Sequence, residues 1–84
     1  DVPSSTLPRS ALGTDEGALL EVLAGTDLAT SKGDARRSVQ GGGVYVNGER
    51  IDDTDAQLSE EHAIEGRFIV LRKGRRSHHL IEVV

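Results

Sequence analysis

Apolar residues recur at helical spacing over residues 15–24. This spacing is typical of a helix that buries one face, here through the stripe Leu19, Leu20, Val22 and Leu23. Thr14 or Asp15 can cap the start of the helix, and Gly25 can end it. Gly17 weakens the first turn, since a glycine there costs about 1 kcal/mol relative to alanine.

A second helix is predicted to begin after Ser31, whose hydroxyl can accept a hydrogen bond from the amide of Asp34. The Asp34 carboxylate sits in the first turn, where the helix dipole favours negative charge, so the two residues form a capping-box-like pair. At about 100° per residue, Ala35 and Val39 fall on one side and face the core. The glycines at 41–43 end the helix. Its outward side carries Arg36 and Arg37, with Lys32 at the border.

A β-hairpin is predicted next. Val-Tyr-Val at 44–46 alternates and runs into Asn47-Gly48, a strong short hairpin signal, so that residues 49–51 return antiparallel. The acidic residues at 52–55 have some likeness to a calcium loop, but they lack its full spacing and terminal Glu. We interpret them as a solvated turn.

The C-terminal part predicts two more strands. Residues 59–65 form one short helical turn, capped by Ser59. Residues 67–72 (Arg-Phe-Ile-Val-Leu-Arg) are apolar on both faces, as expected of a central strand. A glycine-containing turn at 73–76 leads into a returning strand at 78–84.

Two helices followed by strands predict an α+β fold, in which two N-terminal helices pack on a small antiparallel sheet covered on one side. With 84 residues the chain is one small domain at most, assigned to residues 15–84. Residues 1–14 contain both prolines and no apolar period, and predict a linker or flexible arm. The predicted core consists of Leu19, Leu20, Leu23, Leu28, Ala35, Val39, Val44, Val46, Ile51, Leu58, Ile64, Phe68, Val70, Leu80 and Ile81.

The net charge is −4, yet the cations are concentrated in two segments. Residues 31–51 hold four Lys or Arg against two Asp or Glu (net +2), and residues 67–84 hold five against one (net +4). Acidic residues dominate 1–30 (net −4) and 52–66 (net −6). Binding of a polyanion depends on local potential, so two basic segments that meet in space would form a nucleic-acid footprint.

Candidate contacts to RNA come from these two segments. Arginine offers planar, bidentate donors to phosphate, lysine offers a point charge, and a helix N-terminus adds backbone amides. Each set taken alone is also typical of a solvated helix face or of a charged hairpin tip. With only Tyr45 and Phe68 as aromatics, recognition of a folded RNA by shape and backbone is favoured over base stacking. The predicted RNA-binding residues are Ser31, Lys32, Arg36, Arg37, Arg72, Lys73, Arg75, Arg76 and His78.

Other classes of site find little support. There is no cysteine, and His78 and His79 are adjacent on a predicted strand, so they point to opposite faces and cannot both reach one metal. One of these imidazoles is suited to stack on a base or to donate to a phosphate, although a partly buried polar side chain is the more common role of such a histidine. No phosphate loop, nucleophile elbow or paired carboxylates occur. No membrane span or export leader is visible, and Asp1 in place of Met indicates a piece of a longer protein.

Two motifs support a family resemblance. Ser-Lys-Gly-Asp-Ala-Arg-Arg at 31–37 and Gly-Val-Tyr-Val-Asn-Gly at 43–48 resemble the alpha-L RNA-binding motif, the S-four-like fold named after a small-subunit ribosomal protein. Residues 66–80 look like the strand and Leu-Arg-Lys-Gly-Lys-Lys-like turn of the C-terminal domain of bacterial-type tyrosyl-tRNA synthetases. Ser38 departs from this pattern, because many relatives have a larger apolar residue there, and Gly41 extends the glycine run.

This resemblance implies a module that holds tRNA(Tyr), by its variable arm and anticodon side, for a separate catalytic domain of a class I tyrosine–tRNA ligase. The ATP-handling signatures of the synthetase are absent, so this chain is not expected to aminoacylate or to hold a cofactor. The parent enzyme would use ATP and Mg²⁺ and act as a homodimer in the cytoplasm. The family's helix motif and basic turn fall on Ser31, Lys32, Arg36, Arg37, Lys73, Arg75 and Arg76.

Two alternatives stay open at this point. The same fold serves other RNA proteins, such as a pseudouridine synthase or a ribosome-associated heat-shock factor, in which the motif typically precedes the rest of the protein. The chain is also compatible with a protein-interaction domain dominated by its acidic segments, whose binding would be insensitive to loss of the arginines.

Overall fold

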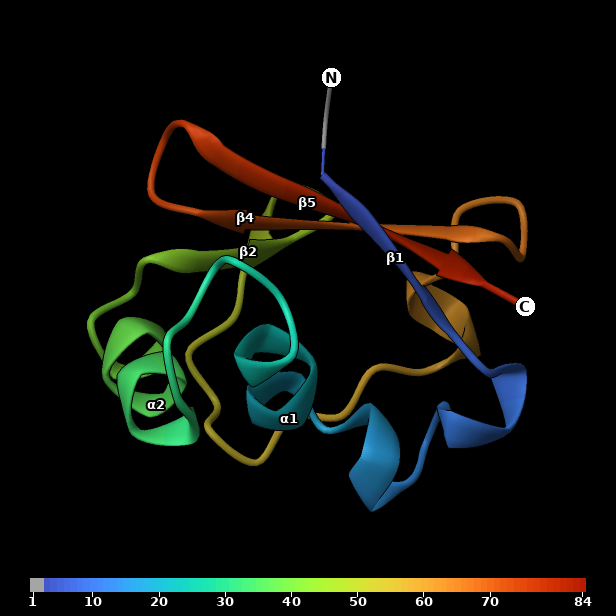
Figure 1. The fold of residues 1–84 in the computed structure, drawn as a ribbon, viewed down its shortest axis with the longest axis horizontal. Coiled ribbons are helices and arrows are strands. Elements are labelled where there is room, and N and C mark those ends of the chain that lie inside the picture. The colour runs from blue at the N-terminus through green and yellow to red at the C-terminus, as the bar shows by residue number, and fades with distance from the viewer. Residues whose placement is uncertain (1–2) are drawn as a thin grey trace.

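Both α-helices lie on one face of a five-stranded sheet in the computed structural model, which describes residues 3–84 (Figure 1). The strands follow the order β1-β5-β4-β2-β3 across the sheet. Within the described residues, no helix is long and apolar enough to cross a membrane. The helices are α1 (Leu19–Ala24) and α2 (Lys32–Gln40), and the strands are β1 (Ser4–Leu7), β2 (Val44–Val46), β3 (Glu49–Arg50), β4 (Phe68–Lys73) and β5 (Ser77–Val83).

The predicted α+β class is confirmed, with two corrections. The sheet is mixed and not purely antiparallel, because β1 runs parallel to β5 whereas the other neighbouring strands are antiparallel. The helices also do not come first in the chain, since β1 precedes them.

Strand β1 lies within the segment 1–14 that the sequence predicts as a linker or flexible arm. Its pairing begins with a hydrogen bond from Leu80 N to Pro3 O (2.9 Å), and a 3-10 turn at Arg9–Ala11 follows, whose last residue is buried. The described part of this segment therefore belongs to the folded unit; residues 1 and 2 lie outside the described residues. The sequence does not reveal the strand, because Ser-Ser-Thr-Leu shows no apolar alternation and backbone pairing leaves no mark in a sequence.

The helix predicted over 15–24 is divided in two. A 3-10 turn at Asp15–Gly17, capped by the Thr14 hydroxyl, precedes α1, and the extended backbone of Ala18 separates them. Gly17 is needed here because a Cβ at this position would lie 2.5 Å from the backbone oxygen of Ala11. Thr14 caps the 3-10 turn and not α1, whose N-cap residue Ala18 makes no side-chain cap. The predicted end of the helix at Gly25 is confirmed.

The hairpin turn at Asn47-Gly48 is confirmed, since both residues adopt the positive φ angles (52° and 83°) that this turn requires. The side chain of Asn47 adds to the sheet, because its Oδ1 accepts from Val70 N (2.9 Å) and its Nδ2 donates to His62 O (2.5 Å). The predicted short turn over 59–65 is observed as a 3-10 turn at Glu60–His62.

The core lies between the helices and the inner face of the sheet. In β4 it is formed by Ile69 and Leu71, both 0% exposed, whereas Phe68 and Val70, which the sequence places in the core, lie half-buried on the other face. The predicted core positions of β4 are therefore shifted by one residue. Four consecutive apolar residues fit the core with either set of alternate side chains, so the sequence pattern cannot show which set faces the helices. Three other predicted core residues are less buried than expected: Ile51 and Leu80 are half-buried, and Ile64 is 48% exposed. The confirmed core positions are Leu19, Leu20, Leu23, Leu28, Ala35, Val39, Val44, Val46, Leu58 and Ile81.

Candidate nucleic-acid interface

Helix α2 carries the first group of cations, Lys32, Arg36 and Arg37, and its position is fixed by its N-terminal cap and its buried side. The Ser31 hydroxyl accepts from the Asp34 amide (3.1 Å), as predicted, and Ala35 and Val39 are fully buried beneath the helix. Gly41 ends the helix. Ser31 thus fixes where the helix begins, while its O–H can still donate to a partner. Arg36 and Arg37 are exposed.

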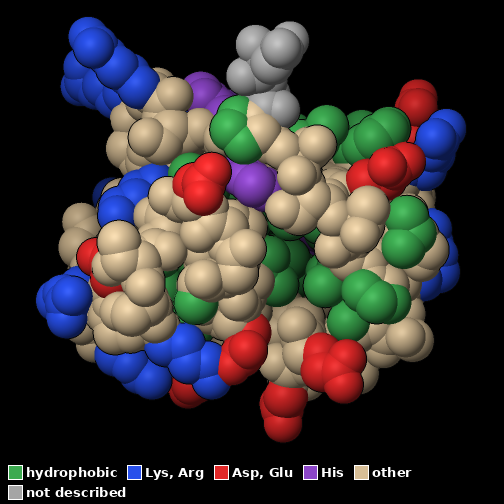
Figure 2. All heavy atoms as spheres, in the orientation of Figure 1, with side chains coloured by type: hydrophobic (Ala, Val, Ile, Leu, Met, Phe, Trp, Pro, Cys, Tyr) green, Lys and Arg blue, Asp and Glu red, His purple; other side chains and the backbone are tan. Residues whose placement is uncertain are grey.

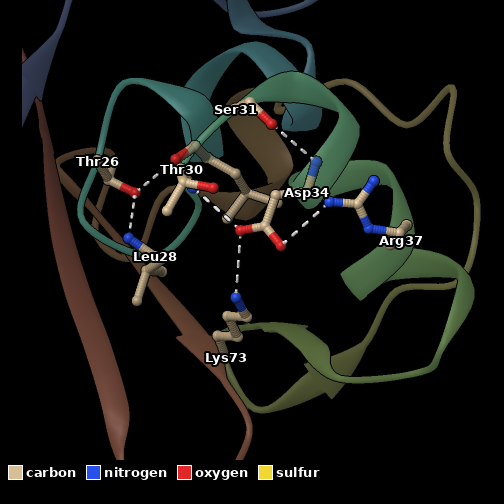
Figure 3. Close-up of polar contacts among 8 residues, drawn as sticks. Thr26, Leu28, Thr30, Ser31, Asp34, Arg37 and Lys73 are labelled. Carbon is tan, nitrogen blue, oxygen red and sulfur yellow. Dashed lines mark hydrogen bonds and ion pairs between the residues drawn. The ribbon is translucent and has the colours of Figure 1, made fainter.

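The Asp34 carboxylate joins this helix to the end of β4 (Figure 3). Its Oδ2 accepts from the Thr30 amide (3.0 Å) and lies 3.5 Å from Lys73 Nζ. Its Oδ1 lies 3.9 Å from Arg37 Nη2. One carboxylate therefore holds a cation from α2 and a cation from β4 together.

These contacts hold the pKa of Asp34 below its usual value of 3.8, chiefly through the hydrogen bond from the Thr30 amide and then through the charges of Lys73 and Arg37. A lowered pKa in the folded state means that the carboxylate stabilises the fold while it is charged, and that this contribution is lost as the pH falls through the folded-state pKa.

We therefore expect Asp34→Asn to lower the Tm at pH 7, because asparagine cannot hold the two cations by charge. The difference from the wild-type Tm should shrink as the pH is lowered below about 4, where the unfolded-state carboxyl takes up a proton first and the folded-state carboxyl follows at lower pH. Thermal melts of both proteins from pH 7 to pH 2 measure this. A difference that stays constant across the range would show that the charge of Asp34 does not stabilise the fold.

The second basic set occupies the turn between β4 and β5. Gly74 has φ of 68°, and its amide donates to the backbone oxygen of Gly43, just beyond α2 (2.8 Å). Arg75 and Arg76 project from this turn and are exposed. The hydrogen bond between the glycines therefore places the turn beside the C-terminal end of α2. The two basic segments, 31–51 and 67–84, meet in space.

The cations of α2 do not all face this junction. Lys32 forms an ion pair with Glu21 of α1. Arg36 lines a groove of about 350 Å³ together with Lys32 and the carboxylates of Asp15, Glu21 and Asp55. Arg37 lies on the other side of the helix, beside Asp34. The structure thus brings Arg37 and Lys73 together at Asp34, places Arg75 and Arg76 on the adjoining β4–β5 turn, and sets Lys32 and Arg36 beside the carboxylates of the groove.

The remaining predicted residues, Arg72 and His78, lie on the sheet face that the helices leave open. The guanidinium of Arg72 sits over the ring of Tyr45, with Cζ 3.9 Å from the ring centroid. His78 is exposed, whereas its neighbour His79 is 4% exposed and contacts Ser5 Oγ through Nε2 (2.8 Å), so the predicted division of the two imidazoles between opposite faces is confirmed.

Sequence reasoning overlooks two residues of this surface. Tyr45 supports Arg72, and Asp34 connects the two basic sets in addition to its predicted place at the helix start. The Asn47-Gly48 turn fixes the register of β2 and could have identified the open-face position of Tyr45. The contact between Asp34 and Lys73 depends on the tertiary fold and has no local signal.

The distribution of charge agrees with this geometry (Figure 2). Lys and Arg side chains gather on the left side of the view, over α2 and at the tip of the β4–β5 turn, and others lie at the right edge. Asp and Glu side chains are most numerous along the lower edge, and others lie near the top of the view. Among residues 3–84, no three His, Asp or Glu side chains come together in an arrangement that could hold a metal ion. The prominent chemical feature is thus a local concentration of cations on an acidic domain.

Comparison with known proteins relates this chain to tyrosine–tRNA ligases. The family description "Tyrosine–tRNA ligase SYY-like C-terminal domain" matches residues 1–81. The tyrosine–tRNA ligase of Roseiflexus castenholzii is 49% identical over 84 residues, which is 100% of this chain and 20% of that protein. The tyrosine–tRNA ligase of Geobacillus stearothermophilus is 46% identical over 63 residues, 75% of this chain and 15% of that protein.

A third relative, the tyrosine–tRNA ligase of Lactobacillus delbrueckii subsp. bulgaricus, is 32% identical over 83 residues, 99% of this chain and 20% of that protein. The chain therefore spans a fifth or less of the length of the curated relatives named here. With an α+β fold, a basic junction between α2 and the β4–β5 turn, and a match over nearly its whole length, the chain belongs to the family of tyrosine–tRNA ligase SYY-like C-terminal domains.

Proposed function

We propose that this chain binds tRNA, in particular tRNA(Tyr), and holds it for the catalytic part of a tyrosine–tRNA ligase. Family membership supports the assignment to such an enzyme, and it disfavours the alternatives of a pseudouridine synthase or a ribosome-associated heat-shock factor. The parent enzyme would act in the cytoplasm as a homodimer that uses ATP and Mg²⁺. This domain would contribute binding and no catalytic group.

The observation that carries the proposal is the junction at Asp34. Because this carboxylate lies within 4 Å of both Arg37 and Lys73, cations from two segments 36 positions apart in the sequence (37 to 73) occupy one surface. A phosphate backbone that contacts Arg37 and Lys73 would continue toward Arg75 and Arg76, which follow Lys73 on the β4–β5 turn.

The binding mode follows from the side chains. Arg37, Arg75 and Arg76 offer planar forks that fit phosphate oxygens, and Lys73 adds a point charge held by Asp34. Such contacts fix the register of an RNA without reading its sequence. The domain would thus select tRNA(Tyr) by the shape of the variable arm and the path of its backbone, in agreement with recognition of folded RNA.

The division of cations along α2 provides a matched pair of variants. We expect Arg37→Ala to weaken tRNA binding by about fivefold and to reduce the slope of log K against log salt by about one, because it removes one phosphate contact. Arg36→Ala removes the same charge from the same helix but from the side that faces the acidic groove, and we expect a change within about twofold.

Binding isotherms at several salt concentrations measure both effects. Arg37 is well exposed (73% of its side chain), so its replacement leaves the core intact, and thermal melts verify this. A loss of affinity that is equal for the two variants, or larger for Arg36→Ala, would place the footprint on the groove side of α2 and contradict the proposed surface.

A further inference from the structure

Four planar side chains stand in register across the open face of the sheet. Backbone pairing places Arg50 of β3 opposite Tyr45 of β2, Tyr45 opposite Arg72 of β4, and Arg72 opposite His78 of β5. Residues paired in this way point to the same face of a sheet. The residues that flank this row in β2 and β4, such as Val44 and Leu71, are buried on the helix side. We refer to Arg50, Tyr45, Arg72 and His78 as the cross-strand row.

The centre of the cross-strand row is held in place before any partner arrives. Arg72 Cζ lies 3.9 Å from the centroid of the Tyr45 ring, a distance at which a guanidinium and an aromatic face attract each other. Arg72 Nε is buried and meets no hydrogen-bond acceptor within the described part of the chain. A planar cation that is already ordered loses less conformational entropy when it binds a second planar group.

The surroundings of the row favour an anionic partner. The row contains two arginines, a histidine and no carboxylate. At the same end of the sheet, the turn that joins β4 and β5 carries Arg75 and Arg76, whereas the Lys73 side chain faces the helix side and contacts Asp34. The open-face carboxylate of Glu82 lies at the other end of β5, opposite Phe68, where it pairs with Arg67 (3.8 Å).

We propose that the cross-strand row is a stacking platform for one or two unpaired bases of the bound RNA. Guanidinium, imidazole and phenol planes all stack on bases, and neighbouring strands lie about 4.8 Å apart, so adjacent side chains of the row can contact consecutive bases. The inference rests on the proposed function, because the backbone of the same RNA would be held by Arg75 and Arg76 on the turn at this end of the sheet. A count of Phe, Trp and Tyr misses this platform, since only Tyr45 of its four members is one of these residues.

The test compares two stem-loop RNAs. One has unpaired nucleotides beside its stem, and the other carries abasic sugars at those positions, so that both have the same number of phosphates. We expect the wild-type chain to bind the RNA with bases about tenfold more tightly, with equal salt slopes for the two RNAs. Arg72→Lys keeps the charge and removes the plane, and should bind both RNAs alike.

Two control variants separate stacking from charge. Tyr45→Phe keeps the ring beneath Arg72 and should retain the preference for bases. Lys73→Ala should weaken binding of both RNAs equally and reduce the salt slope by about one. Thermal melts show whether each variant is folded.

The outcomes distinguish this inference from the proposed function. If the wild-type chain binds the two RNAs equally and with salt dependence, the stacking platform alone is overturned. The same holds if the preference for the RNA with bases survives Arg72→Lys. In either case the open face would be left for a protein partner. Absence of salt-dependent binding to these RNAs and to tRNA(Tyr) would overturn both.

Discussion

Replacing Arg75 and Arg76 together with alanine is expected to weaken tRNA binding by about 10- to 100-fold without lowering the Tm. Both side chains project from the β4–β5 turn and are exposed, so their removal leaves no cavity and no buried partner. Each charged contact to a phosphate contributes about 1 kcal/mol, and the two together account for this loss. The slope of log K against log salt should fall by about two.

Arg67→Ala serves as the control for this prediction. Arg67 lies at the opposite end of β4, over the ring of Phe68, and its loss changes the net charge by the same amount as the loss of either turn arginine alone. We expect it to change tRNA affinity by less than about twofold, because long-range effects between exposed charges are screened by salt. An equal loss for Arg67→Ala and for Arg75→Ala would mean that total charge, and not the turn, controls binding. A large fall in Tm for the double variant would assign the turn arginines a structural role.

Replacing Leu71 with alanine is expected to lower the free energy of unfolding by about 2–4 kcal/mol. Leu71 is 0% exposed and lies opposite His79 in the register of β4 and β5, so its truncation leaves a cavity in the centre of the core. A domain of this size has a total stability of about 4–13 kcal/mol, so the variant should lose a large share of it and melt more than about 10 °C lower.

Val70→Ala is the matched control, because Val70 is the next residue of the same strand but faces outward and is half-buried. It should cost about 1 kcal/mol or less. Urea or thermal unfolding of the two variants measures the difference. A greater loss for Val70→Ala than for Leu71→Ala would mean that β4 buries the opposite face.

These two strand positions show where sequence reasoning reaches its limit in this fold. Helix α2 is predictable because its cap at Ser31, its apolar positions Ala35 and Val39 and its terminal glycine all indicate the same structure. The hairpin is predictable for a similar reason, since Asn47-Gly48 fits only a narrow class of turn. In β4, four consecutive apolar residues satisfy either face, and only the pairing with β5 decides between them.

Strand β1 shows a second limit. Its residues are polar or only partly buried, and it is held by backbone hydrogen bonds to β5, so neither periodicity nor composition distinguishes it from a linker. Pro3 and Pro8, which flank the strand, also make the segment resemble a linker. Proline is nevertheless compatible with the end of an edge strand.

The candidate site was predictable in part. The two clusters of cations are visible in the sequence, and the fold brings the two segments together, as the predicted nucleic-acid footprint requires. The difference between Arg36 and Arg37 is not visible, because it depends on how α2 packs against Glu21 of α1 and on the loop that carries Asp55. The row of Arg50, Tyr45, Arg72 and His78 depends on register across four strands, which no single segment specifies.

The most direct test of the account is a salt titration of tRNA binding by this chain with three RNAs: intact tRNA(Tyr), the same tRNA without its long variable arm, and a tRNA whose variable arm is naturally short. We predict a steep salt dependence and a clear preference for the intact long arm, because the basic junction recognises shape and backbone charge. Equal and weak binding of all three RNAs would contradict the claim that this surface holds tRNA(Tyr).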